Sequence, residues 1–237
     1  MDSQWFEQSI DVIPAVDVLG EEAVRLERGD YDRVVERAEA PAALAARYAA
    51  AGARWVHVVD LDGARGGGVR PQLVRDVARG APGLRVQASG GIRTLADAEA
   101  LLRAGAERVI VGTAAVADPA PWVAAFGERV AIALDVRDGT VRTRGWTEGS
   151  GLTLDDALAR AHAAEVRVVL LTSIDRDGTL TGPDLELVRR VTVDDTAPAV
   201  LAAGGVRNPS DIEALAVAGA QAAVVGRALL ATRTIPG

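Results

Sequence analysis

Short apolar runs alternate with longer Ala- and Leu-rich stretches along almost the whole chain. The runs are apolar at consecutive positions, which is typical of parallel strands covered on both faces, and the longer stretches have helical spacing. Strands are predicted at residues 12–17, 55–60, 85–88, 108–111, 130–135, 166–172, 199–202 and 222–225. Helices are predicted between them at residues 40–51, 71–79, 95–104, 119–126, 154–163, 183–190 and 209–218.

Eight strands alternating with helices predict an α/β fold, a single (β/α)8 barrel that forms one domain over residues 1–237. Residues 1–10 have neither a basic start nor an apolar run, and we expect them to form a short N-terminal extension. Only "GRALLATRTIPG" follows the last strand, so the eighth helix is expected to be short or truncated.

A twenty-eight-residue segment occurs twice, at 89–116 and 203–230, with 13 identical positions out of 28. Each copy covers a strand, a Gly-Gly turn, a helix and the next strand. The two copies therefore predict a barrel built from two half-barrel repeats.

Glycines follow several strand ends in both copies. Where backbone amides approach closely at a strand end and a helix begins, an anion can bind, and phosphate commonly binds in this corner of such barrels. The alternative is that the glycines only permit tight turns. The predicted phosphate-binding residues are Gly90, Gly91, Gly112, Thr113, Gly178, Gly204, Gly205, Gly226 and Arg227.

The composition excludes several kinds of catalytic group and disfavours several kinds of partner. The sequence contains no cysteine, and all 26 of its Lys and Arg residues are arginine, which excludes cysteine nucleophiles, lysine Schiff bases and the P-loop lysine. Two histidines disfavour a histidine-rich metal site, and a net charge of −7 disfavours a nucleic-acid surface. No apolar stretch reaches membrane-spanning length, so we expect a cytoplasmic protein without a membrane partner, acting as a monomer.

Three carboxylates are the candidate catalytic groups. Asp17 and Asp135 are the first charged residues after apolar strands, at equivalent places in the two halves, and Asp177 follows the sixth strand. Carboxylates in different surroundings can divide the roles of general acid and general base, although strand-end aspartates can also cap helices or form salt bridges. His57 is expected in the barrel interior, and Asp175 is expected to support its loop or to face solvent.

Ordered motifs make the chain similar to a known family. "IPAVDV", "AVRLERGD", "HVVDLDGA", "SGGIR", "VGTAA", "RGW" and "DGTLTGP" resemble the phosphoribosylformimino-aminoimidazole carboxamide ribotide isomerases of histidine biosynthesis. The resemblance implies an Amadori rearrangement of an aminoaldose to an aminoketose, on a bis-phosphorylated small molecule, without metal or organic cofactor. It implies that Asp17 is the base, that Asp177 or Asp135 is the acid, and that Thr172 orients the substrate.

The resemblance extends to the dual-substrate phosphoribosyl isomerase A subgroup, which also isomerises phosphoribosylanthranilate for tryptophan biosynthesis. Arg25 on the first loop and Arg144 and Trp146 on the fifth loop match its pattern. An arginine can pair with the anthranilate carboxylate, whereas a tryptophan can stack on the imidazole. The alternatives are a histidine-only isomerase and an Arg144 that is merely a solvated loop charge.

Two features depart from the family pattern. "LLTSIDRDGT" resembles the related cyclase, imidazole glycerol phosphate synthase, because Ser173 stands where the isomerase usually has an acidic residue. The cysteine and lysine of the cyclase pattern are missing, however, which disfavours that function. The second departure is the short C-terminal region. A non-catalytic phosphate-binding barrel is the remaining alternative, in which the aspartates would be dispensable.

Overall fold

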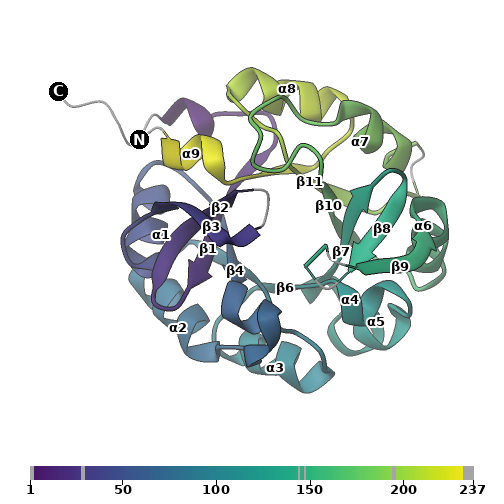
Figure 1. The fold of residues 1–237 in the computed structure, drawn as a ribbon, viewed down its shortest axis with the longest axis horizontal. Helices are drawn as coiled ribbons and strands as arrows, with labels where there is room; N and C mark the ends of the chain where they lie inside the picture. Colours follow the sequence, from purple (N-terminus) through teal and green to yellow (C-terminus); the bar gives the residue numbers. More distant parts are fainter. Residues whose placement is uncertain (1–2, 28–29, 144, 147, 194–195, 232–237) are drawn as a thin grey trace.

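The computed structural model describes residues 3–27, 30–143, 145–146, 148–193 and 196–231. Within these ranges, eight parallel strands close into a barrel, because β12 pairs with β1 and β7 pairs with β10. Figure 1 looks along the barrel, with the helices forming the outer ring. The barrel strands are β1 (Asp11–Leu19), β4 (Trp55–Asp60), β5 (Arg85–Ser89), β6 (Arg108–Val111), β7 (Val130–Arg137), β10 (Val168–Ser173), β11 (Ala199–Ala203) and β12 (Ala222–Val225). The predicted fold class is therefore confirmed.

Helices pack around the barrel in the predicted order. The longer ones are α1 (Pro41–Ala50), α2 (Pro71–Gly80), α3 (Leu95–Arg103), α5 (Ala120–Phe126), α6 (Leu154–Ala163), α7 (Leu185–Val191) and α8 (Pro209–Val217). Short segments add α4 (Thr113–Val116), α9 (Arg227–Ala231), η1 (Ser3–Trp5), η2 (Gly63–Gly67) and η3 (Gly127–Arg129). None of the helices in the described ranges combines the length and the apolar character that crossing a bilayer requires.

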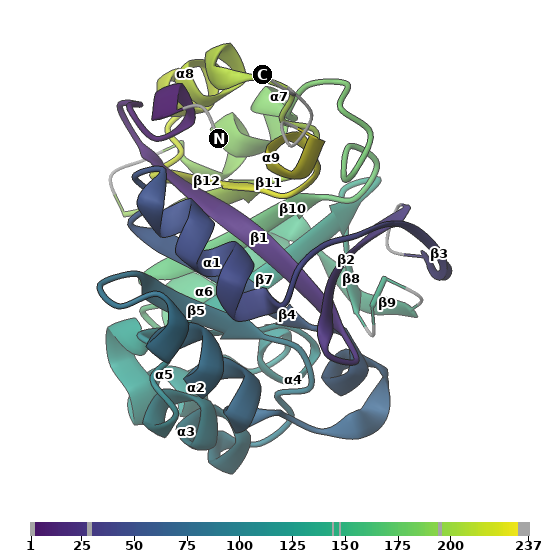
Figure 2. The ribbon, with the colours of Figure 1, turned by 90° about the vertical axis from the view of Figure 1, so that its left-hand side faces the viewer.

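Two antiparallel hairpins were not predicted, and they occupy equivalent places in the two half-barrels. β2 (Glu22–Glu27) and β3 (Asp30–Arg37) follow β1, while β8 (Thr140–Thr143) and β9 (Glu148–Thr153) follow β7. Figure 2 shows both hairpins on the same side of the barrel. The hydrophobic pattern missed them because their strands are rich in polar residues and lack the continuous apolar run of a barrel strand.

Several boundaries also differ from the prediction, for local reasons. The sixth barrel strand begins at Val168, not at 166, because the Val166 amide still donates to Ala161 O at the end of α6. The seventh helix begins at Leu185, since the Asp184 side chain caps it by accepting from the Leu187 amide at 3.0 Å.

The core has two layers. A large cluster fills the space between barrel and helices, and it includes Trp5, which is buried although it belongs to the predicted N-terminal extension. A smaller cluster fills the barrel, with Ile13, Leu170 and Leu201 among its members. As in other barrels of this type, the interior is packed, which leaves the carboxyl ends of the strands as the open face.

Candidate active site

A cavity of about 740 Å³ lies at the carboxyl ends of the barrel strands. Each barrel strand, or the loop that follows it, contributes at least one lining residue. The cavity is thus where the barrel architecture places active sites. Among its lining residues are Asp17, Asp135, Asp177, Thr172, Trp146, Gly90, Gly91, Gly112, Thr113 and Gly226, all of which were predicted from the sequence.

Asp17 and Asp135 occupy matching positions in the two halves of the barrel. Asp17 lies on β1 opposite Val24 of β2, and Asp135 lies on β7 opposite Arg142 of β8. Both side chains are half-buried and both line the cavity. The half-barrel repeat therefore brings two carboxyl groups to one cavity from equivalent strands.

The Asp135 carboxyl group is embedded in other cavity side chains. Burial raises the pKa of Asp135, and the nearby negative charge of Asp177 raises it further. Hydrogen bonds from the side chains of Thr172 and Trp146 stabilise the ionised form and oppose this shift. A carboxyl group whose pKa is raised in this way is suited to hold a proton.

Asp177 lies in the loop that follows β10. The loop turns tightly, since the Asp177 amide donates to Ser173 O at 3.0 Å and to Ile174 O at 3.2 Å. The neighbouring Asp175 is exposed and forms a salt bridge with Arg137, with 3.2 Å between Oδ1 and Nε. Of the two loop aspartates, only Asp177 lines the cavity.

The first glycine corner follows β5 and β6. Gly90 and Gly91 have φ of 96° and 78°, and a Cβ atom on Gly90 would lie 2.1 Å from Asp60 O. The turn itself therefore requires glycine at both positions. Their presence is explained without phosphate binding. Both also line the cavity, together with Gly112 and Thr113 at the start of α4.

The second glycine corner follows β10, β11 and β12, and it is less open to the cavity. Gly204 and Gly205 again have positive φ, at 99° and 85°. The Arg227 guanidinium donates to Gly178 O, which links the sixth and eighth loops. Of the predicted residues in this corner only Gly226 is among those lining the cavity.

Two of the four predicted substrate-contact residues line the cavity, and the side chains of the other two lie outside the described part of the structure. Thr172 and Trp146 line the cavity and both contact Asp135. Arg25 belongs to β2, but its side chain lies outside the described part of the structure, as does Arg144 as a whole. Ser173, which departs from the family pattern, is buried and bonds Asp184 at 3.3 Å, away from the cavity.

His57 lines the cavity from the barrel interior. His57 is only 4% exposed, and its Nε2 lies 3.4 Å from Ser89 Oγ. Burial lowers the pKa of His57 to about 3, and the charge of Arg108 acts in the same direction. Arg108 donates through Nη2 to Gln87 Oε1 at 2.6 Å, within the barrel. His57 is therefore neutral at physiological pH, in the interior position predicted for it.

Sequence reasoning missed several cavity-lining residues, namely Ser89, Arg65, Arg93 and Arg142. Ser89 and Arg93 flank the Gly-Gly pair of the first repeat, which is a signal that could have identified them. Arg93 donates to the carbonyl oxygens of Gly91 and Gly63 at 3.2 and 3.0 Å. Arg142 belongs to the unpredicted hairpin, and no feature of the sequence distinguishes it.

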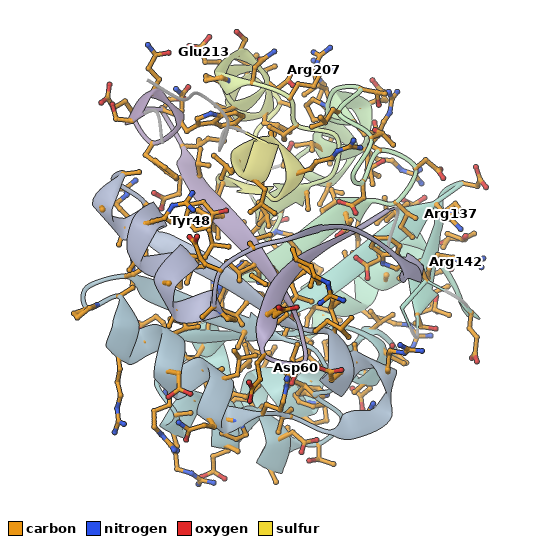
Figure 3. All side chains as sticks on the ribbon, turned by 60° about the vertical axis from the view of Figure 1, so that its left-hand side comes forward. Tyr48, Asp60, Arg137, Arg142, Arg207 and Glu213 are labelled. Atoms are coloured by element: carbon orange, nitrogen blue, oxygen red, sulfur yellow. The ribbon has the colours of Figure 1, made fainter. Side chains whose placement is uncertain are left out.

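An ion-pair cluster holds the first hairpin beside the cavity. Arg70 donates through Nη2 to Asp60 Oδ1 at 2.6 Å and through Nη1 to Gly20 O at 2.5 Å. Asp62 Oδ2 accepts from the Gly20 amide at 2.7 Å and lies 3.1 Å from Arg70 Nη2. The turn between β1 and β2 is thus attached to the loop after β4. Figure 3 labels Asp60 among the other side chains.

Residues 11–234 match the family model described as "Histidine biosynthesis protein". A protein of Thermomicrobium roseum is 48% identical over 224 residues, covering 92% of this chain and 91% of the relative. One of Sorangium cellulosum is 46% identical over 227 residues, covering 93% of each chain, and one of Frankia casuarinae is 42% identical over 228 residues, covering 94% and 88%. All three are named 1-(5-phosphoribosyl)-5-((5-phosphoribosylamino)methylideneamino)imidazole-4-carboxamide isomerase. With a barrel of this topology and near-complete coverage, the chain belongs to the histidine biosynthesis protein family and is one of its isomerases.

Proposed function

We propose that this isomerase carries out the Amadori rearrangement of the phosphoribosylformimino aminoaldose that is named in its relatives, as a step of histidine biosynthesis. The observation that carries the proposal is the convergence of Asp17, Asp135 and Asp177 on one cavity that extends to glycine corners of both half-barrels. A compound with a phosphate at each end and an aminoaldose sugar in the middle fits this distribution of groups.

The three carboxyl groups divide the proton transfers. A proton from the Asp135 and Asp177 pair goes to the ring oxygen, the ring C–O bond breaks, and a protonated Schiff base forms at C1′ of the sugar. Asp17 then removes the C2′ proton to give an enolamine, which becomes the ketone at C2′ when C1′ is protonated. Atoms and electrons balance within the substrate, since C1′ is reduced and C2′ is oxidised.

The glycine corners are proposed to bind the two phosphates. Gly91 and Thr113 supply backbone amides in the first corner, while Gly205 and Gly226 supply them in the second. Crystals soaked with sulfate are expected to contain an anion at each corner. Anions found only elsewhere would contradict this part of the proposal.

Steady-state turnover of the aminoaldose tests the reaction directly. Asp17→Asn is expected to lower kcat by about 10³-fold or more, because it removes the base, whereas Asp175→Asn is the matched control on an exposed loop position. Undiminished turnover by Asp17→Asn would contradict the role of the base. Substrate binding without turnover by the wild type would instead support the non-catalytic barrel.

The acid is assigned by comparing Asp135→Asn with Asp177→Asn across pH. The residue that donates the proton is the one whose replacement abolishes the alkaline limb of the kcat profile. The other replacement is expected to shift this limb to lower pH, because it removes the negative charge that raises the pKa of the donor.

We propose further that the same cavity accepts phosphoribosylanthranilate. The support is the match of the first and fifth loops to the dual-substrate pattern. Trp146 lines the cavity and hydrogen-bonds Asp135, so its ring can stack on the imidazole of the first substrate, and the second substrate needs a cation for its carboxylate. Arg25 and Arg144 are the proposed partners of the anthranilate carboxylate. Rescue of a tryptophan auxotroph that lacks its own isomerase is the test, and rescue of a histidine auxotroph alone would leave a single-substrate enzyme.

A further inference from the structure

Arg142 reaches the cavity from the second hairpin. It lies on β8 between Asp135 of β7 on one side and Gly149 of β9 on the other. A Cβ atom on Gly149 would be 4.0 Å from Arg142 Nη1, so the guanidinium extends toward Gly149, where no side chain covers it. Figure 3 labels Arg142, and Arg137 on the preceding strand.

The bonding state of Arg142 differs from that of the other arginines near the site. Arg93 and Arg227 donate to backbone carbonyl groups, and Arg70 is bound to carboxylates through its terminal nitrogens, although its Nε is also buried without a partner among the described residues. The Nε of Arg142 is buried, yet among the described residues it has no hydrogen-bond partner. A buried donor without a partner destabilises the folded protein, so such a group usually has a ligand or another purpose.

The half-barrel repeat shows that the fold does not require an arginine at this position. Asp17 in the first half is paired with Val24, which is buried, whereas Asp135 in the second half is paired with Arg142. A valine is sufficient to complete the hairpin in one half. The charge at Arg142 therefore needs an explanation other than hairpin formation.

We propose that Arg142 is a substrate-binding residue that holds an oxyanion of the substrate on the hairpin side of the cavity. The proposal rests on the proposed function, since it concerns the same substrates. A guanidinium binds carboxylate or phosphate oxygens through two parallel N–H groups, and binding would satisfy the Nε that is buried without a partner. In a cavity with three carboxyl groups, such a cation also offsets the repulsion of a polyanionic ligand.

The oxyanion has two possible sources, and the substrates separate them. The histidine-pathway aminoaldose carries two phosphates and no carboxylate, whereas phosphoribosylanthranilate carries one phosphate and a carboxylate. A phosphate contact affects both compounds, and a carboxylate contact affects only the second.

The experiment compares Arg142→Gln and Arg142→Lys with Arg137→Gln, an arginine on the neighbouring strand that pairs with the exposed Asp175 and does not line the cavity. Kd for both compounds is measured by calorimetry in an Asp17→Asn background, where turnover does not interfere, and KM and kcat are measured in the otherwise wild-type enzyme. Arg142→Gln is expected to weaken binding of at least one compound about tenfold or more with kcat changed much less, and Arg142→Lys is expected to restore part of the loss.

Thermal stability separates binding from a structural role. Without ligand, Arg142→Gln should melt at the wild-type temperature or above it, because it removes a buried donor that has no partner. Unchanged Kd for both compounds, or a loss of binding that is matched by a loss of stability, would overturn the inference. A wild type that binds the compounds without turning them over would instead overturn the proposed reaction, and the Kd comparison would still test Arg142.

Discussion

At the scale of single residues, the cavity contains ionisable groups whose burial lowers the stability of the folded protein. Asp135 is embedded among Thr172, Trp146 and the negative Asp177, and burial raises its pKa. His57 is kept neutral below it in the barrel. Such perturbed groups are concentrated at functional sites, because a reaction needs them in states that water would not favour.

Asp135→Asn is expected to make the protein more stable and less active. Because the pKa of Asp135 is raised in the folded state, its ionisation destabilises the fold above that pKa, and this penalty disappears as the pH falls below the unfolded value. We expect the free energy of unfolding at pH 7 to rise by about 0.5–2 kcal/mol, a common range for removing strain of this kind. Urea unfolding at pH 7 and pH 4 measures it. A variant that is less stable at pH 7, or a gain that does not shrink at pH 4, would contradict this assignment.

At the scale of elements, loops after neighbouring strands are held together by close packing and by ion pairs. Gly90 contacts the backbone of Asp60, and Asp60 in turn binds Arg70. These contacts join the loops after β1, β4 and β5 to one another.

Gly90→Ala is expected to be much more harmful than an alanine at another left-handed glycine. Gly83 also has positive φ, at 87°, but a Cβ atom there would meet nothing within 4 Å. Gly83→Ala should therefore cost about 1 kcal/mol for backbone strain alone, and Gly90→Ala should cost about 2 kcal/mol more because the new Cβ overlaps Asp60 O. Chemical denaturation of the two variants measures the difference, and equal losses would show that the loop relaxes freely.

Arg70→Gln is expected to loosen the first hairpin. The change leaves the buried Asp60 carboxylate without its cation and the Gly20 carbonyl without one donor, at a cost of about 1–3 kcal/mol. Because the hairpin carries Arg25, KM for substrate should rise more than kcat falls. Arg75→Gln is the control, because Arg75 lies on α2, the helix that begins directly after Arg70, and bonds only Gln72 among described residues. Kinetics indistinguishable between the two variants would mean that Arg70 does not position the hairpin.

At the scale of the whole molecule, a buried histidine in the barrel interior makes the stability of the fold depend on pH. His57, Gln87 and Arg108 form a buried polar layer across three neighbouring barrel strands. The barrel closes around this layer, so proton uptake by His57 requires the interior to accept a second positive charge near Arg108.

Stability is therefore expected to decline as the pH falls from about 6.5 toward 3. The pKa of His57 is about 3 in the folded protein against an ordinary value of 6.5, so the unfolded chain takes up this proton first. The loss from this group approaches about 5 kcal/mol at the low end, at about 1.4 kcal/mol per pKa unit. His57→Asn should remove this part of the decline, while His162→Gln, at an exposed position of α6, should keep it. If the stability of the wild type and of His57→Asn declined equally as the pH falls, His57 would not be the cause of the decline.

The hydrophobic pattern was sufficient for the barrel, because buried parallel strands and amphipathic helices leave periodic signals in the chain, and the identity of two segments was sufficient for the repeat. The positions of Asp17 and Asp135 could also be predicted, since each is the first charge after an apolar strand. The two hairpins could not be predicted, because their strands lack the continuous apolar run of a barrel strand, and Arg142 was missed with them.

The sequence by itself determined the order of the elements, the duplicated glycine turns and the strand-end carboxyl groups, because each depends on neighbours within one element. Only the tertiary structure decided which side chains share the cavity, since closing the barrel brings β1 and β7 to one cavity from opposite halves of the chain. It also decided the pKa shifts of Asp135 and His57, because burial and the charges of distant residues act only after the chain has folded.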